Sequence, residues 1–450
     1  MMDEGRKDLI SRQQELLTRM KGMGLCPASE HFDRVRRAKS GEGDIRPFDR
    51  LFPHAEHLET PCGPCRRVRV EAPIDGVRSR EGYLCPATLW GGPPDPRVLA
   101  DLTNQPEWGS LQEREVVYFD TETTALATGA GTYTFLIGLG WFEGERFVVE
   151  QYFMEDYDQE AGLVAAVDQA LQGVRALVSY NGTKFDLPLL RARWILQRRR
   201  LPDPPLHLDL LAYARRLWRQ RLPNCSLGQV EADILDIQRL SDVAGSWVPR
   251  IYFDFVRGVR IERMIPVFDH HAQDIFSLGA LTSVLVRAWA EPHAKAFDHA
   301  SDQWGLGCML LRRGRVTEAL KRMESAVLAT RDEERAFGMA MRLARVYKRQ
   351  GKLDEAVALW AARVAQARAG RLEPLVELAK HAEHRLGDFH EALRWTQRAI
   401  ELLDSEHELR QWIEGSAGQE TMALSSKEAL ALHHRLTRLK RRIQRSAGSA

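Results

Sequence analysis

The stretch Val116-Val117-Tyr118-Phe119-Asp120-Thr121-Glu122-Thr123 predicts both the fold and the chemistry of its part of the chain. A short run of large apolar residues is typical of a strand that is buried on both faces of a sheet. Because side chains alternate along a strand, Asp120 and Glu122 would lie on one face. Two like charges at the end of a buried strand destabilise each other unless a cation is present. The stretch therefore predicts a central strand that ends in two metal-binding carboxylates.

The segments after this strand complete the pattern of an α/β domain. Two further apolar runs, Thr134 to Trp141 and Phe147 to Phe153, are joined by Glu143-Gly144-Glu145, which indicates a hairpin. A helix is expected over Glu160 to Leu171 and a fourth strand over Ala176 to Tyr180. A helix that crosses between strands implies a parallel pairing. Three strands in meander order and then this crossover predict an RNase H-like α/β domain, with a mixed sheet flanked by helices.

Two later segments add carboxylates to the first pair. In Asn181-Gly182-Thr183-Lys184-Phe185-Asp186, the last residue lies where the fourth strand passes into a helix, although an Asp there is also a common helix cap. In Phe268-Asp269-His270-His271-Ala272-Gln273-Asp274, His270 and Asp274 would share one helix face. Mg²⁺ prefers oxygen ligands, and two such ions about 3.5–4 Å apart activate a water and stabilise a leaving oxygen. The combination predicts a two-metal site for phosphodiester hydrolysis.

The three motifs, in this order, resemble the exonuclease motifs of the DEDD superfamily, and the second is most similar to the proofreading domains of family B DNA polymerases. The segment between the second and third motifs resembles the YprB-like RNase H-type family. The residues that carry this second resemblance are Leu222-Pro223-Asn224-Cys225-Ser226-Leu227, Gln238-Arg239, Asp242-Val243, Gly245, Pro249 and Tyr252. The resemblance covers about residues 110 to 290. It implies a nuclease that attacks the 3′ end of DNA or RNA with two Mg²⁺ or Mn²⁺ ions.

The resemblance also implies roles for single residues. Both the metal ligands and the catalytic carboxylates would be Asp120, Glu122, Asp186 and Asp274. The superfamily carries either a Tyr four residues before the last Asp or a His five residues before it. This chain has His270 at the first spacing and Asp269 at the second, and we choose His270 as the catalytic residue that orients the water.

Weaker candidates surround these motifs. Contacts with the substrate are expected from Thr121, Thr123, Leu126, Asn181 and Lys184, each of which could equally be an ordinary turn or core residue. Asp209 is expected to support the start of a helix, and we leave it out of the site. Cys62 and Cys65 have the spacing of half a zinc site, but structural zinc usually needs two such clusters, so the sequence does not favour zinc.

From about residue 300 a helical repeat replaces the strand patterns. Gly314, Gly351 and Gly387 recur at intervals of 37 and 36 residues, and each is followed five residues later by the Ala of a Glu-Ala pair. This spacing is close to the ~34-residue tetratricopeptide unit. We expect about three degenerate repeats, stacked as a short solenoid that binds a protein partner. The basic helix Ala429 to Arg445 is expected to cap it, and contact with nucleic acid is the alternative.

These patterns divide the chain of 450 residues into four parts. The expected order is an N-terminal extension of uncertain fold over 1–110, an RNase H-like exonuclease domain over 111–292, tetratricopeptide-like repeats over 300–410, and a basic C-terminal helix and tail over 411–450. The repeats make the second half an all-α domain behind the α/β domain.

Composition bounds the class of protein. The 64 Lys and Arg against 62 Asp and Glu leave a net charge of +2, so nucleic-acid binding would depend on local patches. No window approaches the ~18 consecutive apolar residues of a spanning helix, and the charged N-terminus lacks the apolar core of a signal peptide. Six scattered cysteines fit a reducing compartment. We expect a cytoplasmic protein with no membrane partner.

Two other functions compete with the nuclease. The first is a catalytically weak or dead RNase H-like module that binds nucleic acid without cutting it, and the second is an adaptor based on the repeats. The presence of all four carboxylates favours the nuclease. The sequence leaves open whether the substrate is DNA or RNA, because no motif reports a contact with the 2′-hydroxyl. The resemblance does not distinguish exonuclease from endonuclease action.

Overall fold

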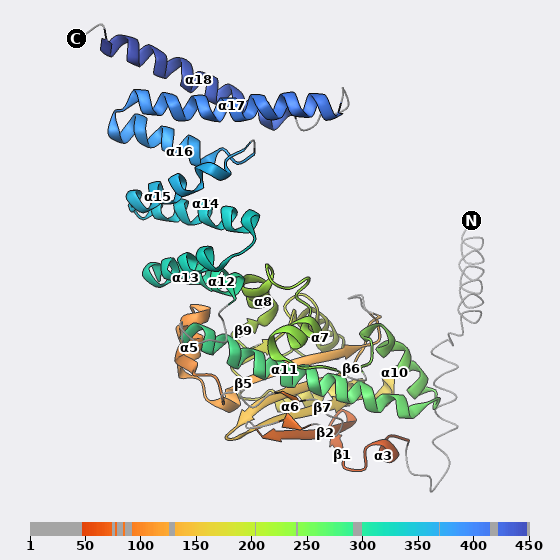
Figure 1. The fold of residues 1–450 in the computed structure, drawn as a ribbon. Helices are drawn as coiled ribbons and strands as arrows, with labels where there is room; N and C mark the ends of the chain where they lie inside the picture. The colour runs from red at the N-terminus through yellow and green to blue at the C-terminus, as the bar shows by residue number, and fades with distance from the viewer. Residues whose placement is uncertain are drawn as a thin grey trace, which may run out of the picture.

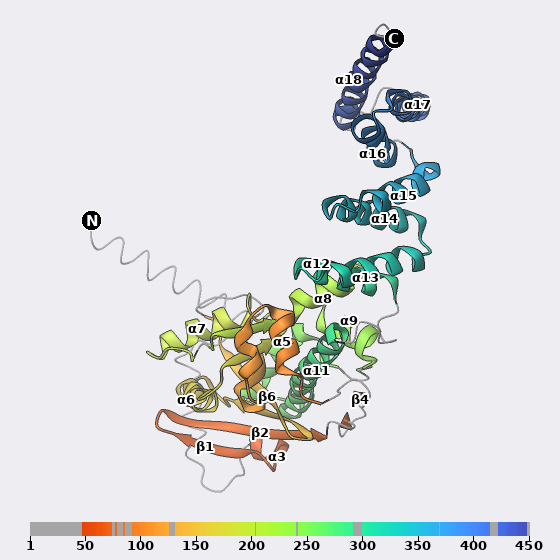
Figure 2. The same cartoon turned by 90° about the vertical axis from the view of Figure 1, so that its left-hand side faces the viewer.

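The computed structural model describes residues 47–73, 77–78, 84–85, 92–125, 131–202, 204–239, 242–290, 299–368, 370–414 and 422–447. An α/β unit forms one end of the molecule, and a column of helices leads away from it to the C-terminus (Figure 1). A second view at right angles shows the same column standing on the α/β unit (Figure 2). Among the described residues, no helix is both long and apolar enough to cross a bilayer.

The α/β unit is built on a mixed sheet of seven strands in the order β1-β2-β7-β6-β5-β8-β9. The strands are β1 (Glu56–Thr60), β2 (Gly63–Pro73), β5 (Val116–Thr123), β6 (Thr134–Glu143), β7 (Arg146–Phe153), β8 (Ala176–Ser179) and β9 (Leu206–Asp209), and β3 (Val77–Arg78) pairs with β4 (Leu84–Cys85) separately. The strand β5 is antiparallel to β6 and parallel to β8. The predicted meander, crossover and mixed sheet are therefore confirmed.

The sheet begins ahead of residue 111, where the sequence suggested that the domain starts. Strand β2 pairs antiparallel with β7, from Arg66 opposite Phe153 to Pro73 opposite Arg146. Strand β1 then forms the outer edge of the sheet. Residues 56–73 are therefore part of the same sheet as the predicted central strand, whereas residues 1–46 of the expected extension lie outside the described residues.

Helices cover both faces of this sheet. They are α3 (Pro47–Leu51), α5 (Pro96–Thr103), α6 (Glu160–Ala170), α7 (Asp186–Leu196), α8 (Leu210–Trp218), α9 (Leu227–Val230), α10 (Val248–Val256) and α11 (Met264–Ala290). Val117 and Phe119 of β5 belong to one hydrophobic core with α6 and α7, whereas Tyr118 belongs to the other core with α8 and most of α11. The alternation along β5 thus buries the strand on both sides, as its apolar run predicts.

A glycine in β6 lets α11 approach the sheet closely. A Cβ on Gly138 would lie 2.1 Å from Ile275 Cδ1 and 2.5 Å from His271 Cε1. The His271 ring is fixed, because Gln151 Nε2 donates to its Nδ1 at 3.0 Å and its Nε2 donates to the carbonyl oxygen of Asp120 at 3.1 Å. Burial lowers the pKa of His271 to about 4, so the ring is neutral and can accept as well as donate. Gly138 therefore fixes the position of α11 against β5 and β6.

We expect Gly138→Ala to lower the free energy of unfolding by about 1–3 kcal/mol, the usual effect of overpacking a core. Urea denaturation measures this change. Gly109→Ala is the matched control, because its Cβ would meet Ala100 Cβ at an ordinary 3.7 Å. Equal stability of the two variants would contradict this account of the close approach.

The helical column consists of helices that follow one another along the chain. They are α12 (Ala300–Arg312), α13 (Val316–Ala329), α14 (Glu333–Arg349), α15 (Leu353–Arg363), α16 (Glu373–His381), α17 (Phe389–Glu414) and α18 (Met422–Ala447). The recurring Gly314, Gly351 and Gly387 have φ of +76°, +76° and +68°, and lie in the turns before α13, α15 and α17. Glycine adopts this left-handed conformation without strain. The sequence repeat thus corresponds to one kind of helical hairpin, formed three times.

The first hairpin is attached firmly to the α/β unit. In α12, a Cβ on Gly305 would lie 2.7 Å from the carbonyl oxygens of Arg216 and Leu217, so the backbones of α12 and α8 are in close contact. Arg221 also pairs at 2.7 Å with Asp302, which is buried. These contacts hold the start of the column against the end of α8.

The last helix covers the end of the column. Leu432 and Leu439 of α18 are buried, and Arg435 and Arg438 pair at 2.7 and 2.8 Å with the buried Glu383. Two arginines of this basic helix are therefore used in packing, which agrees with the interpretation of α18 as a cap.

Candidate active site

Three elements bring four carboxylates together. Asp120 and Glu122 lie on β5, Asp186 is the first residue of α7, and Asp274 lies in the middle of α11. Burial raises the pKa of Asp120 well above its ordinary value, and the charges of Asp274, Asp186 and Glu122 raise it further. Each of these three carboxylates thus acts electrostatically on Asp120.

Two other members of the cluster show the same effect. Burial raises the pKa of Glu122 to about 8, with Asp274 and Asp186 adding to the rise and His270 opposing it. Burial also raises the pKa of Asp186 to about 6, although a hydrogen bond from Thr121 opposes this shift. The motifs that are separated in the sequence therefore form one site of mutually repelling carboxylates.

The two threonines beside the first carboxylates have partners within the protein. Thr121 Oγ1 donates to Asp186 Oδ1 at 2.5 Å, which ties β5 to the start of α7. Thr123 Oγ1 donates to the carbonyl oxygen of Ala125 at 2.8 Å. Thr121 thus holds Asp186 in the site, and contact of either residue with a nucleotide stays a prediction. Leu126, the third candidate of this segment, lies outside the described residues.

The turn after β8 depends on Asp209. Its carboxylate accepts hydrogen bonds from the amides of Asn181 at 2.8 Å and Thr183 at 3.3 Å, and it caps α8 through the amide of Leu211 at 3.2 Å. Asn181 has a φ of +68°, and Lys184 is exposed. The expected supporting role of Asp209 is confirmed, because it shapes the turn that leads to Asp186.

His270 faces the carboxylates. Its Nε2 lies 3.5 Å from Asp274 Oδ2 and 3.9 Å from Glu122 Oε1, and its Nδ1 lies 2.5 Å from Asp242 Oδ1. Burial alone would lower the pKa of His270, but Asp274, Asp242 and Glu122 together raise it to about 9. Asp269, the other residue that the sequence left open, is exposed. The structure therefore places His270 rather than Asp269 in the site.

Arg239 is a site residue to which the sequence analysis gave no role. Its guanidinium donates to Asp274, donates to Glu231 Oε1 at 2.6 Å, and lies 3.3 Å from Asp242 Oδ2. Glu231 is completely buried, so Arg239 neutralises a charge that water cannot reach. The apolar residues around Arg239 have no regular spacing that would predict a helix or a strand. The family resemblance was the one signal in the sequence that pointed to this residue.

The donor set fits a hard divalent cation, because carboxylate oxygens are the ligands that Mg²⁺ prefers and a cation would relieve their repulsion. Among the described residues, no three His, Cys, Asp or Glu side chains converge as they stand on one ion. Asp274 is turned toward Arg239 and Asp186 toward Thr121. Binding of a metal would therefore compete with these two contacts.

The half zinc motif lies apart from this site. Cys62 is exposed in the turn between β1 and β2, where Arg199 donates to its sulfur at 3.2 Å. Cys65 is buried in the core, and burial raises the pKa of its thiol to about 12. A thiol that resists ionisation is a poor metal ligand, because metals bind the thiolate.

Comparison with known proteins gives the class of the central part of the chain. The family model described as the RNase H superfamily matches residues 117–286. This range begins in β5 and ends in α11, so it includes all four carboxylates. The α/β unit is accordingly an RNase H superfamily domain.

One relative gives the family of the chain as a whole. The protein described as "Uncharacterized protein YprB" of Bacillus subtilis (strain 168) is 31% identical over 334 residues, which are 73% of this chain and 75% of the relative. The chain belongs to the YprB family. Among solved structures, the family B DNA polymerase from the archaeon Pyrobaculum calidifontis aligns at 16% identity with a TM-score of 0.30, over 44% of this chain and 29% of the polymerase.

Proposed function

We propose that the protein is a nuclease that removes nucleotides from the 3′ end of DNA or RNA, with two Mg²⁺ or Mn²⁺ ions held by Asp120, Glu122, Asp186 and Asp274. The observation that carries the proposal is the grouping of these four carboxylates, in which burial raises the pKa of Asp120, Glu122 and Asp186, and neighbouring carboxylates raise the pKa of Asp120 and Glu122 further. Such repulsion costs stability without a cation, so a site of this kind is expected to have a functional use. Membership of the RNase H superfamily supports the same class of reaction.

Bound divalent ions would supply an activated water and a stabilised leaving oxygen. The chain's own groups would position the reactants. Thr121 fixes Asp186, and Asp242 orients His270 through Nδ1, so that Nε2 faces the carboxylates. When the charges of Asp274 and Glu122 are neutralised, two of the three groups that raise the pKa of His270 no longer do so, and Asp242 alone still raises it. Its Nε2 could then accept a proton from the attacking water.

The substrate would meet the site from the turn before α7. Lys184 is exposed there, and the Phe185 side chain is 50% exposed, directly before Asp186. An exposed aromatic ring can stack on a nucleobase, and Lys can contact a phosphate. We assign the terminal nucleotide to this turn.

The three helical hairpins are proposed to be tetratricopeptide-like repeats. Their support is the recurrence of a left-handed glycine and of Ala319, Ala356 and Ala392, which are completely buried. Repeats of this kind usually bind a protein, so a protein partner belongs to the proposal.

The test is hydrolysis of 5′-labelled single-stranded DNA and RNA in the presence of Mg²⁺, Mn²⁺ or EDTA. We expect a metal-dependent ladder that shortens from the 3′ end, and no ladder from the Asp120→Ala/Asp186→Ala variant. Asp354→Ala, which removes an exposed carboxylate of α15, is the control and should keep the activity. Oligonucleotide binding without cleavage by the unaltered protein would favour the binding module, and neither binding nor cleavage would favour the adaptor.

A further inference from the structure

An arginine-lined groove runs from the end of α8 across α12 to α14. It consists of two adjacent cavities of about 340 and 210 Å³, which share Cys308, Arg312 and Arg342 as lining residues. Its basic residues are Arg215, Arg216, Arg219, Arg312, Arg342, Arg345 and Arg349. No described acidic residue lines either cavity.

Most of this positive charge has no counterion among the residues that the structure describes. Arg345 pairs with Glu373 of α16 at 2.7 Å. Within the described ranges, the other six arginines have no carboxylate within ion-pair distance, and each of them is exposed. The whole chain has a net charge of only +2, so six unpaired guanidinium groups in one groove are a strong local excess. Like charges gathered in this way favour binding of a polyanion.

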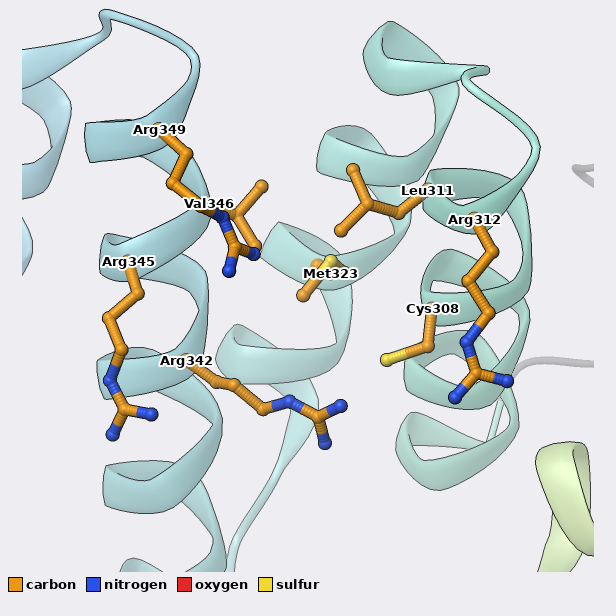
Figure 3. A pocket seen from close by; sticks show the side chains of 8 residues that line it. All are labelled: Cys308, Leu311, Arg312, Met323, Arg342, Arg345, Val346 and Arg349. Carbon is orange, nitrogen blue, oxygen red and sulfur yellow. The ribbon is translucent and has the colours of Figure 1, made fainter.

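The groove has a fixed shape. Figure 3 shows Arg312 on one helix and Arg342 on the facing one, with Leu311, Met323 and Val346 between them. The guanidinium carbon of Arg342 lies 5.9 Å from the centre of the Trp304 ring, so this charge is held over an aromatic face. The close contact of Gly305 with α8 and the Arg221–Asp302 ion pair hold the α8 and α12 sides of the groove together, and Trp304 of α12 shares a hydrophobic core with Val346 of α14. A ligand would therefore meet a preformed surface, which lowers the cost of binding.

Helix α8 connects the groove to the active site. It begins at Asp209, whose carboxylate shapes the turn that leads to Asp186, and Arg215, Arg216 and Arg219 lie at its other end. Nine residues of helix span about 13 Å at a rise of 1.5 Å per residue. A strand of stacked nucleotides advances about 3.4 Å per residue, so a few nucleotides cover this length.

We propose that this groove binds the sugar-phosphate backbone of a nucleic acid whose 3′ end occupies the active site. The proposal rests on the proposed nuclease function and adds a second contact several nucleotides from the reacting bond. Guanidinium groups suit this role, because their planar forks bind phosphate oxygens in pairs. The groove ends toward α16, where Glu373 and Glu377 pair with Arg345 and Lys348. Contacts with the backbone imply little sequence preference and a strong dependence on salt.

The test is binding of a fluorescent 20-nucleotide single strand in EDTA, with Arg312→Gln/Arg342→Gln compared with the unaltered protein. We expect at least about tenfold weaker binding and a salt dependence reduced by about one to two counterions. The control is Arg394→Gln/Arg398→Gln, which removes the same charge from exposed positions of α17 and should bind normally. Thermal unfolding checks that both variants fold, and the exposed Arg349→Gln is a milder third variant that should show a smaller loss of the same kind.

Equal affinity of the groove variant and the control variant would overturn the proposal. Loss of polyglutamate binding with oligonucleotide binding unchanged would also overturn it, and would assign the groove to an acidic protein. The assay contains no metal and needs no hydrolysis. If the protein is not a nuclease, only the hydrolysis experiment shows it. If the groove does not bind nucleic acid, only this binding experiment shows it.

Discussion

Replacing Asp120 with Asn is expected to abolish phosphodiester hydrolysis and, at the same time, to stabilise the metal-free protein. Loss of a catalytic group of this kind lowers turnover by about 10³-fold or more. The gain in stability follows from the raised pKa of Asp120, which means that its negative charge is unfavourable in the folded state. Asn removes the charge and keeps the shape, so we expect the free energy of unfolding at pH 8 to rise by about 1–3 kcal/mol.

The sign of this effect can be checked by pH. A carboxyl group whose pKa is higher in the folded than in the unfolded state favours folding at low pH, and this advantage is lost as the pH rises through the folded pKa. The stabilising effect of Asp120→Asn should therefore shrink as the pH is lowered. Urea denaturation in EDTA measures it. The control is Asp209→Asn, which weakens three hydrogen bonds from backbone amides and should destabilise the protein.

Metal ions give a second measurement on the same variants. Mn²⁺ should raise the melting temperature of the unaltered protein, because a ligand that binds the folded state stabilises it. The rise should be much smaller for Asp120→Asn. A variant that is less stable in EDTA and still stabilised by Mn²⁺ would show that Asp120 is a structural residue.

The second large effect is expected at His270. His270→Ala should lower kcat by about 10²–10⁴-fold and leave the melting shift with Mn²⁺ largely unchanged, because the imidazole would transfer a proton and is not among the proposed metal ligands. Single-turnover hydrolysis of a labelled oligonucleotide measures the loss. Asp269→Ala is the matched control, because Asp269 is exposed, lies next to His270 and is five residues before Asp274. It should keep its kcat.

Asp242→Asn adds a test of positioning. It keeps a side chain near Nδ1 but removes the negative charge that orients His270 and helps to raise its pKa. We expect a smaller loss of kcat than with His270→Ala, and a shifted pH profile of kcat. Normal turnover in His270→Ala, together with a loss in Asp269→Ala, would move the water-orienting role to Asp269.

The centre of the sheet could be predicted from sequence because its strands obey a simple rule. Val116 to Phe119 are apolar, and both faces of their strand are covered by helices. The crossover through α6 brings β8 parallel to β5. Asp120, Glu122 and Asp186 could be predicted because they lie toward the end of β5 or at the start of α7, whereas Asp274 lies in the middle of α11 and was marked by its spacing from His270. Local pattern and tertiary position agree in this part of the chain.

Strand β2 could not be assigned to the sheet in the same way, because its three arginines interrupt the apolar run that is typical of a buried strand. Arg66 pairs with Glu155 at 3.1 Å, and Arg67 and Arg69 pair with Glu150 at 3.4 and 3.2 Å. These partners come from β7 or directly follow it, so they are known only once the strands are paired. An arginine-rich segment read alone resembles an exposed loop. The role of Arg239 could not be predicted for a similar reason. It depends on ion pairs with Glu231, Asp242 and Asp274, which come from different parts of the fold.

The attachment of the first hairpin has a consequence for how the protein folds. Leu306, Met309 and Leu310 of α12 and Ala319 of α13 belong to the same hydrophobic core as Trp218 and Trp289, whereas α14 and α15 contribute to a different one. A chain that stopped near residue 300 would leave the apolar ends of α8 and α11 in water. We therefore expect the smallest cooperative folding unit that contains the four carboxylates to extend at least through α13, so that the unit that folds is longer than the unit that carries the chemistry.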